Sequence, residues 1–161
     1  MTVPSTGPSL RILALGNDIL GDDAFAFLVA QRVRERIPGV DVRCSSASGF
    51  HLLDDLLGVE RLLVVDTVMT GNAPPGTVYV VREGDLEVTP GNSPHYTGIF
   101  ETLALARALN LNAPREVLII AVEAADCLTV GGPMHPAVEA VVPVIAEMVE
   151  NTSRNFASEL S

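Results

Sequence analysis

Two aspartates and one histidine, far apart in the sequence, have side chains suited to catalysis. Asp23 ends an acidic loop, Asp66 directly follows the aliphatic residues 62–65, and His95 closes the triplet Ser-Pro-His at 93–95. Two carboxylates and an imidazole suit a borderline divalent ion such as nickel, zinc or cadmium, and they leave positions open for water or substrate. If the fold brings them together, they form a candidate site for metal-assisted hydrolysis.

Each of these three residues also has an ordinary structural explanation. Asp23 could do no more than cap the helix that follows it. Asp66 is harder to explain in this way, because a carboxylate after four aliphatic residues is costly to bury unless it is exposed at a strand end or paired. His95 could be a loop histidine without a role. Residue type and spacing therefore leave both explanations open.

The elements that must position these residues alternate along the chain. Apolar runs predict strands at 11–15, 40–44, 61–66, 77–81 and 116–122, and helical periodicity predicts helices at 24–36, 50–57, 97–109 and 136–150. Pro143 is expected to kink the last helix. The linker 67–76 is short for a parallel crossover, so strand 77–81 is expected to run antiparallel at an edge. The predicted fold is α/β, a three-layer α/β/α sandwich with a five-stranded, mostly parallel sheet carrying one antiparallel edge strand.

This topology would bring the three candidates to one edge of the sheet. Ligands of such sheets bind beyond the carboxyl ends of the strands, where Asp23 and Asp66 lie. If strand 116–122 is parallel to the first strand, the preceding helix runs the opposite way and its amino end, with His95, reaches the same edge. Glu123 follows that strand, and it is either a carboxylate supporting the ligands or simply an exposed strand end.

Size and charge limit the possible partners. We expect residues 1–161 to form a single domain, with flexible ends at 1–9 and 151–161. The net charge of -10, from 20 acidic and 10 basic residues, repels phosphate backbones and anionic lipid, so we expect neither nucleic acid nor membrane as a partner. Without a signal peptide or an apolar run of about 20 residues, we expect a cytoplasmic location. We also expect a monomer.

Other catalytic arrangements fit the sequence less well. The loop 16–21 lacks the lysine and the third glycine of nucleotide-binding loops, and the three aspartates in or beside it would repel phosphate. The serines at 45, 46 and 48 lack a nucleophile elbow and suit turn or capping roles. Cys44 with His95 is only a nominal nucleophile pair, and we expect Cys44 and Cys127 to be reduced and buried. His51 and His135 are expected at the surface or at helix caps.

Several segments, taken in order, resemble the hydrogenase maturation proteases, the endopeptidases that finish the large subunit of NiFe hydrogenases. They are Leu-Gly-Asn-x-x-x-x-Asp-Asp at 15–23, Ser-Gly-Phe-x-Leu-Leu at 48–53, the strand-end Asp66, Pro-Gly-Thr-Val at 75–78, Ser-Pro-His at 93–95 and Pro-Ala-Val-Glu-Ala at 136–140. The resemblance extends over residues 11–149. It implies a helix, sheet, helix sandwich with a five-stranded mixed sheet.

The resemblance also implies an activity and its site. Asp23, Asp66 and His95 fall on the metal-contacting positions of the family. The implied reaction removes a short carboxy-terminal extension from the large-subunit precursor after nickel insertion. The nickel would belong to the substrate, so no permanent cofactor is expected, and zinc or cadmium could substitute for nickel in crystals. Asp23 and Asp66 are both candidates for the general base.

The chain departs from the family pattern at two places. It has Ala-Phe-Ala at 24–26 where the family usually has Gly-x-Gly, and residues 44–48 lack the usual acidic residue, Gly-Gly or Gly-Thr. The second segment is a plausible substrate contact. Two alternatives therefore stay open: a non-catalytic nickel-sensing chaperone of the same fold, and another metallohydrolase similar to the spore germination proteases.

Overall fold

A five-stranded sheet forms the centre of the computed structural model, which describes residues 9–17, 21–47, 49–82 and 94–158, without the side chains of 94–98 and 156–158. The strands are β1 (Leu10–Leu15), β2 (Asp41–Ser45), β3 (Arg61–Val68), β4 (Val78–Arg82) and β5 (Glu116–Glu123). Their order is β2-β1-β3-β5-β4, and only β4 is antiparallel to its neighbour. This confirms the predicted sheet, including the reversed strand at an edge.

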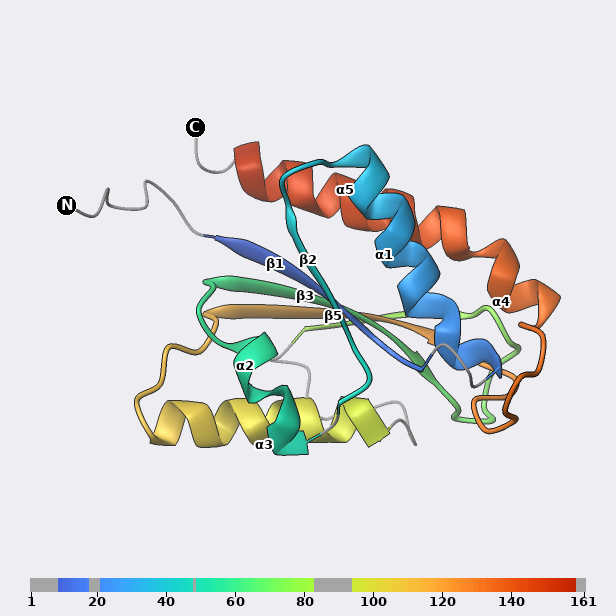
Figure 1. Cartoon of the computed structure of the whole chain (residues 1–161), viewed down its shortest axis with the longest axis horizontal. Helices are drawn as coiled ribbons and strands as arrows, with labels where there is room; N and C mark the ends of the chain where they lie inside the picture. The colour runs from blue at the N-terminus through green and yellow to red at the C-terminus, as the bar shows by residue number, and fades with distance from the viewer. Residues whose placement is uncertain (1–8, 18–20, 48, 83–93, 159–161) are drawn as a thin grey trace.

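Helices cover both faces of the sheet, as Figure 1 shows. The 3₁₀ turn η1 (Gly21–Ala24), α1 (Phe25–Arg36), α4 (Pro136–Ala140) and α5 (Val142–Ser158) lie on one face. The 3₁₀ turn η2 (Gly49–Leu52), α2 (Leu53–Leu56) and α3 (Pro94–Ala108) lie on the other. The aliphatic strands β1, β3 and β5 contribute side chains to a hydrophobic core on each face, as expected for parallel strands covered twice. No described helix is long and apolar enough to cross a membrane.

The strand β3 is longer than predicted, which changes the position of Asp66. Its last residues Thr67 and Val68 pair with Val122 and Glu123 of β5, and Asp66 pairs with Ala121. The prediction that Asp66 ends the strand is therefore wrong. A polar residue inside a strand does not stop the pairing here, because the neighbouring strand β5 continues the ladder. Glu123 is likewise the last residue of β5 and not the first residue after it.

The carboxy-terminal helix is divided where the sequence predicted a kink. The helix α4 ends at Ala140 and α5 begins at Val142, so Pro143 lies in the first turn of α5. A proline fits the first turn without loss, because the N–H groups there have no partner inside the helix. Pro143 thus belongs to a helix start, and the prediction of a kink within one helix is wrong.

The helix α5 also continues to Ser158, beyond the predicted end at residue 150. Thr152 Oγ1 and Ser153 Oγ donate to the carbonyl oxygens four residues earlier at 2.8 and 2.9 Å. Arg154 pairs with Glu150 one turn back at 2.5 Å. The ion pair supports the helix in this polar stretch, whereas the two hydroxyl bonds satisfy polar side chains without adding helix stability.

Candidate functional site

The loop after β1 brings Asp23 back to the end of the sheet. Gly16 N donates to Ser45 O at 3.1 Å, and Asn17 N donates to Asp23 O at 3.0 Å. A Cβ atom at position 16 would lie 2.0 Å from Asp23 O, so only glycine allows this close approach. The Leu-Gly-Asn segment therefore fixes the backbone of Asp23 beside the carboxyl end of β1.

Asp23 and Asp66 meet around Thr67. Thr67 Oγ1 donates to Asp23 Oδ1 at 2.9 Å, and Thr67 N donates to Asp66 Oδ1 at 2.7 Å. Asp66 is completely buried, and Asp23 is 8% exposed. The N-cap position of α1 is Ala24, so Asp23 lies one residue before it, in η1. One threonine thus holds two shielded carboxylates, as the sequence could not show.

The two aspartates approach Thr67 from different faces of the sheet. Val65 lies in the core under α1 and α5, whereas Val64 and Val68 lie in the core beside α3. Because successive residues of a strand point to opposite faces, Thr67 faces α1 and Asp66 faces α3. The carboxylates of Asp23 and Asp66 are therefore both bonded to Thr67 while lying toward different faces of the sheet near the end of β3.

His95 is the second residue of α3, and its side chain lies outside the described residues. The amino end of α3 points toward the end of the molecule where β1, β3 and β5 finish (Figure 1). This is the direction that the sequence predicted for the helix. The contact of the imidazole with the aspartates stays a prediction. Among the described side chains, no group of three or more His, Cys, Asp or Glu residues is arranged to hold a metal ion.

Asp22 is a structural residue whose role sequence reasoning missed. It is 1% exposed, and its carboxylate accepts hydrogen bonds from the backbone N–H groups of Ala125, Asp126 and His135 at 2.7, 2.9 and 2.7 Å. Asp22 N in turn donates to Asp126 O at 2.7 Å. The first aspartate of the Asp-Asp pair therefore joins η1 to the loop after β5, and the second faces Thr67.

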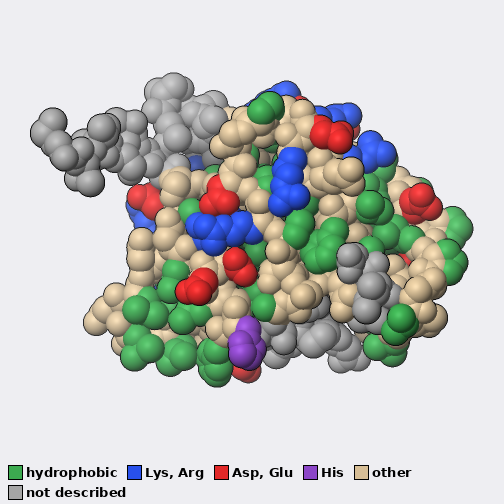
Figure 2. All heavy atoms as spheres, in the orientation of Figure 1, with side chains coloured by type: hydrophobic (Ala, Val, Ile, Leu, Met, Phe, Trp, Pro, Cys, Tyr) green, Lys and Arg blue, Asp and Glu red, His purple; other side chains and the backbone are tan. Residues whose placement is uncertain are grey.

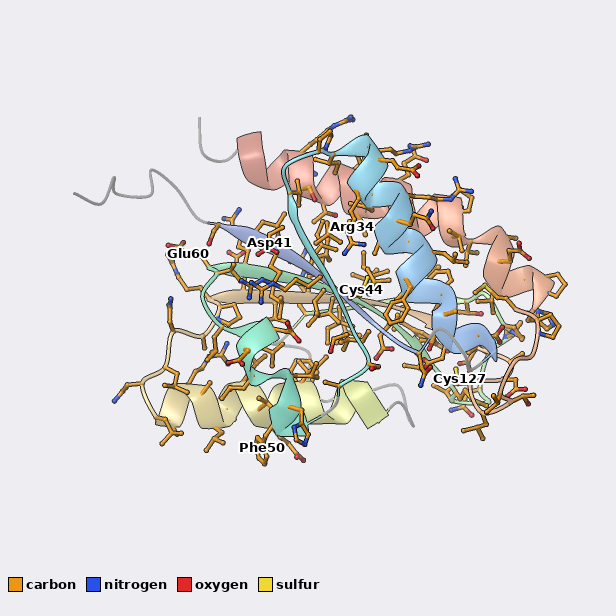
Figure 3. All side chains as sticks on the ribbon, viewed as in Figure 1. Arg34, Asp41, Cys44, Phe50, Glu60 and Cys127 are labelled. Carbon is orange, nitrogen blue, oxygen red and sulfur yellow. The ribbon has the colours of Figure 1, made fainter. Side chains whose placement is uncertain are left out.

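Cys127 lies beside the acidic pair, at the end of the sheet in Figure 3. Its Sγ is 3.5 Å from Thr67 Oγ1. Burial raises the pKa of the thiol to about 12, and the negative charges of Asp23, Asp22 and Asp66 add to this effect against the opposing hydrogen bond of Thr67. A thiol with this pKa is protonated at neutral pH, so it does not supply a nucleophile.

Glu123 is a buried carboxylate that organises the segment after β3. It accepts hydrogen bonds from Thr70 N at 2.9 Å, from Thr70 Oγ1, from Gly71 N at 3.4 Å and from Tyr79 OH at 2.8 Å. Burial alone would raise the pKa of Glu123, but the hydrogen bonds from Thr70, Tyr79 and Gly71 outweigh it and lower the pKa. The explanation of Glu123 as an exposed strand end is therefore wrong.

The remaining candidates have structural or surface positions. Cys44 is exposed on the edge strand β2, 3.8 Å from Arg34 Nη2, so the prediction that it is buried is wrong. An edge strand has no neighbour to cover its outer side. Ser45 Oγ accepts from Ala47 N at 3.0 Å in a turn, and His135 Nδ1 accepts from Ala137 N at 3.1 Å as the cap of α4, both as predicted. His51 is exposed.

These features define a three-layer α/β protein with a shielded acidic site at the ligand-binding edge of its sheet, an arrangement suited to hydrolysis. The family model described as hydrogenase maturation protease matches residues 35–152. The hydrogenase expression/formation protein HoxM of Azotobacter vinelandii is 32% identical over 141 residues, which cover 84% of this chain and 67% of the relative. The chain therefore belongs to the hydrogenase maturation protease family, a family of peptidases.

Further relatives agree with this assignment. The hydrogenase 2 maturation protease of Escherichia coli K12 is 24% identical over 145 residues, which cover 87% of each chain. The solved structure of the hydrogenase maturating endopeptidase HybD from E. coli superposes with a TM-score of 0.76 at 24% identity, covering 91% of this chain and 93% of that one. The solved structure of the NiFe hydrogenase maturation protease HybD from Thermococcus kodakarensis superposes with a TM-score of 0.72 at 24% identity. The superposition covers 89% of this chain and 98% of that one. These structural similarities show that the fold is shared.

Proposed function

We propose that this chain removes the carboxy-terminal extension of a NiFe hydrogenase large-subunit precursor after nickel insertion, and that it recognises nickel held by the precursor. The proposal depends above all on the two buried carboxylates, Asp23 and Asp66, held together by Thr67 at the ligand-binding edge. The names of the relatives support the substrate class, because they are maturation proteases of hydrogenases.

The proposed reaction is hydrolysis by an activated water molecule. Asp23 or Asp66 accepts the proton of a water whose oxygen attacks the scissile carbonyl carbon, and the proton is then passed to the leaving amine. His95, on the helix that starts at this edge, joins the two aspartates in contacting the substrate's nickel. The metal arrives with the precursor, so the peptidase has no resident cofactor. The Cys127 thiol beside the aspartates is not the proposed nucleophile, because its pKa is raised to about 12 by burial.

The partner is the precursor alone, and the protein acts as a cytoplasmic monomer. The net charge of -10 fits a partner that is neither nucleic acid nor an anionic membrane. A cation held by the precursor would be attracted to the acidic edge, which links substrate recognition to the state of the metal.

A nickel-sensing chaperone of the same fold is the second candidate, favoured by one observation. Residues 44–48, which follow from the end of β2, lack the acidic residue, Gly-Gly or Gly-Thr that the family usually has there. Cys44, in this segment, is exposed. A protein with an altered substrate contact could bind the nickel-loaded precursor without cutting it. Cleavage itself distinguishes the two functions.

The test is to incubate the purified protein with nickel-loaded and nickel-free precursor and to weigh the precursor by mass spectrometry. We expect the mass of the extension to be lost from the nickel-loaded precursor only. No loss from either precursor would contradict the peptidase function, and binding without loss would favour the chaperone. Equal loss from both would contradict recognition of nickel.

Substitutions test the assignment of the site. Asp66→Asn keeps an oxygen for the bond from Thr67 N but removes the charge, and His95→Ala removes the imidazole. Each should slow cleavage of the nickel-loaded precursor by about 100-fold or more, the typical contribution of a positioned acid–base group. The matched controls Asp54→Asn and His51→Ala change exposed residues and should cleave normally. Normal rates in both site variants would refute the assignment.

A further inference from the structure

The loop that joins β5 to α4, residues 125–135, presents aliphatic side chains to solvent. Leu128 is 78% exposed and Val130 is 71% exposed, the two highest values among the exposed large hydrophobic side chains of the described residues. Single exposed aliphatic residues are common on proteins. Two near the apex of one loop, beside a candidate active site, call for a more specific explanation. We call Leu128 and Val130 the aliphatic tip.

The loop that carries the aliphatic tip is tied to the rest of the site. The carboxylate of Asp22 accepts the N–H groups of Ala125, Asp126 and His135, so both ends of the loop are bound to η1. Asp126 Oδ1 accepts the N–H groups of Leu128 and Thr129 at 2.8 and 3.0 Å. These bonds hold the turn that displays the tip. The loop is therefore held by Asp22, the residue that precedes Asp23 in the chain.

The aliphatic tip is also next to the acidic pair in space. Cys127, the neighbour of Leu128 in the chain, contacts Thr67 Oγ1 at 3.5 Å, and that hydroxyl contacts Asp23 Oδ1 at 2.9 Å. Hydrophobic side chains are visible in Figure 2 at the end of the molecule where this loop lies in Figure 1. A polypeptide bound at Asp23 and Asp66 must therefore run close to the loop.

We propose that the aliphatic tip is a docking surface for aliphatic side chains of the precursor beside the bond that is cut. This inference rests on the proposed function, which supplies a polypeptide as the occupant. Negative charge limits which side chains could dock there: the carboxylate of Asp126 accepts the N–H groups of Leu128 and Thr129, and the whole chain carries a net charge of -10. Acidic side chains would be repelled, so the docked segment is aliphatic and not acidic.

The test compares two double variants, each of which replaces one exposed leucine and one exposed valine in a different part of the molecule. Leu128→Ser with Val130→Ser removes the tip, and Leu109→Ser with Val144→Ser removes another exposed Leu and Val, which are 59% and 49% exposed. We expect removal of the tip to raise KM for the nickel-loaded precursor by about 10- to 100-fold, with kcat changed less than about twofold, because contacts away from the reacting atoms act mainly on binding. The control pair should leave both constants unchanged. Thermal unfolding of each variant confirms that it is folded.

A binding measurement with the same nickel-loaded precursor, labelled with a fluorophore, separates this inference from the proposed function. If the parent protein binds the precursor without cutting it, and loss of the tip weakens binding, the function is refuted and the docking surface stands. If the protein cuts normally and loss of the tip changes neither KM nor binding, the docking surface is refuted and the function stands. Absence of binding by the parent protein refutes both.

A second copy of this chain is the competing occupant of the tip. Analytical ultracentrifugation of the parent protein and the tip variant tests it. We expect the same monomeric mass for both. A dimer that dissociates when the tip is removed, with KM unchanged, would overturn the proposal in favour of self-association.

Discussion

Replacing Gly16 with alanine should displace Asp23 and slow peptide cleavage without unfolding the protein. The added Cβ would lie 2.0 Å from Asp23 O and 3.3 Å from Asp23 C, and Cβ atoms are essentially never found within 3.0 Å of another heavy atom. The backbone at one of the two residues must therefore move by about 1 Å. Such a movement also strains the bond from Asn17 N to Asp23 O.

The magnitude follows from this displacement. A shift of about 1 Å in a catalytic group costs roughly 100-fold in rate, and forcing an extra methyl group into a packed site costs about 1–3 kcal/mol of stability. We therefore expect Gly16→Ala to cleave the nickel-loaded precursor about 100-fold more slowly. Its free energy of unfolding in urea should fall by about 1–3 kcal/mol, which leaves a folded protein to assay.

Gly39→Ala is the matched control. Gly39 has φ of +93° and no heavy atom within 4 Å of its added Cβ, so alanine there strains the backbone but touches nothing. It should lose about 1–2 kcal/mol of stability and keep the parent rate. If Gly16→Ala cleaves at the parent rate, or if both variants are slowed equally, the reasoning from the close approach to Asp23 is refuted.

Two further predictions concern buried titratable groups. Glu123→Gln should lower the free energy of unfolding by about 1–3 kcal/mol at pH 7, because an amide offers a single acceptor oxygen to four donors. Because the pKa of Glu123 in the folded protein lies below its ordinary value, the stabilisation from its carboxylate is lost as the pH falls below about 4. The urea midpoints of the parent and the variant should therefore converge at low pH. A constant difference between them down to about pH 3 would contradict this prediction. Iodoacetamide at pH 8 should modify exposed Cys44 and spare Cys127, whose pKa is about 12, and peptide mass mapping that finds Cys127 modified first would disprove the protonated thiol.

The direction of the elements could be predicted from sequence, but several of their ends could not. The short linker before β4 restricts the chain to a reversed strand, and this is a local property. The end of β3 depends on Val122 and Glu123 of β5, which pair with Thr67 and Val68 and lie far along the chain. Pro143 is compatible with a kink or with a helix start, and the break between α4 and α5 decides which.

The candidate site was predictable in its acidic members and not in the bonds that hold them. The topology of a parallel sheet is enough to bring Asp23 and Asp66 to one edge. The role of Thr67 requires knowing which face its side chain takes, because it must meet Asp23 while its N–H meets Asp66. Exposure of Cys44 could not be anticipated without knowing that β2 is an edge strand.

The bonds of Asp22 join an early segment of the chain to a late one. Its carboxylate joins η1 to Ala125, Asp126 and His135, residues 103, 104 and 113 positions further along the chain. A chain made from its amino end on a ribosome has Asp22 and Asp23 long before these partners exist. The aspartates therefore wait for most of synthesis to finish before their surroundings can form. We expect a chain truncated before residue 125 to lack the bonds of Asp22 and to have no proteolytic activity.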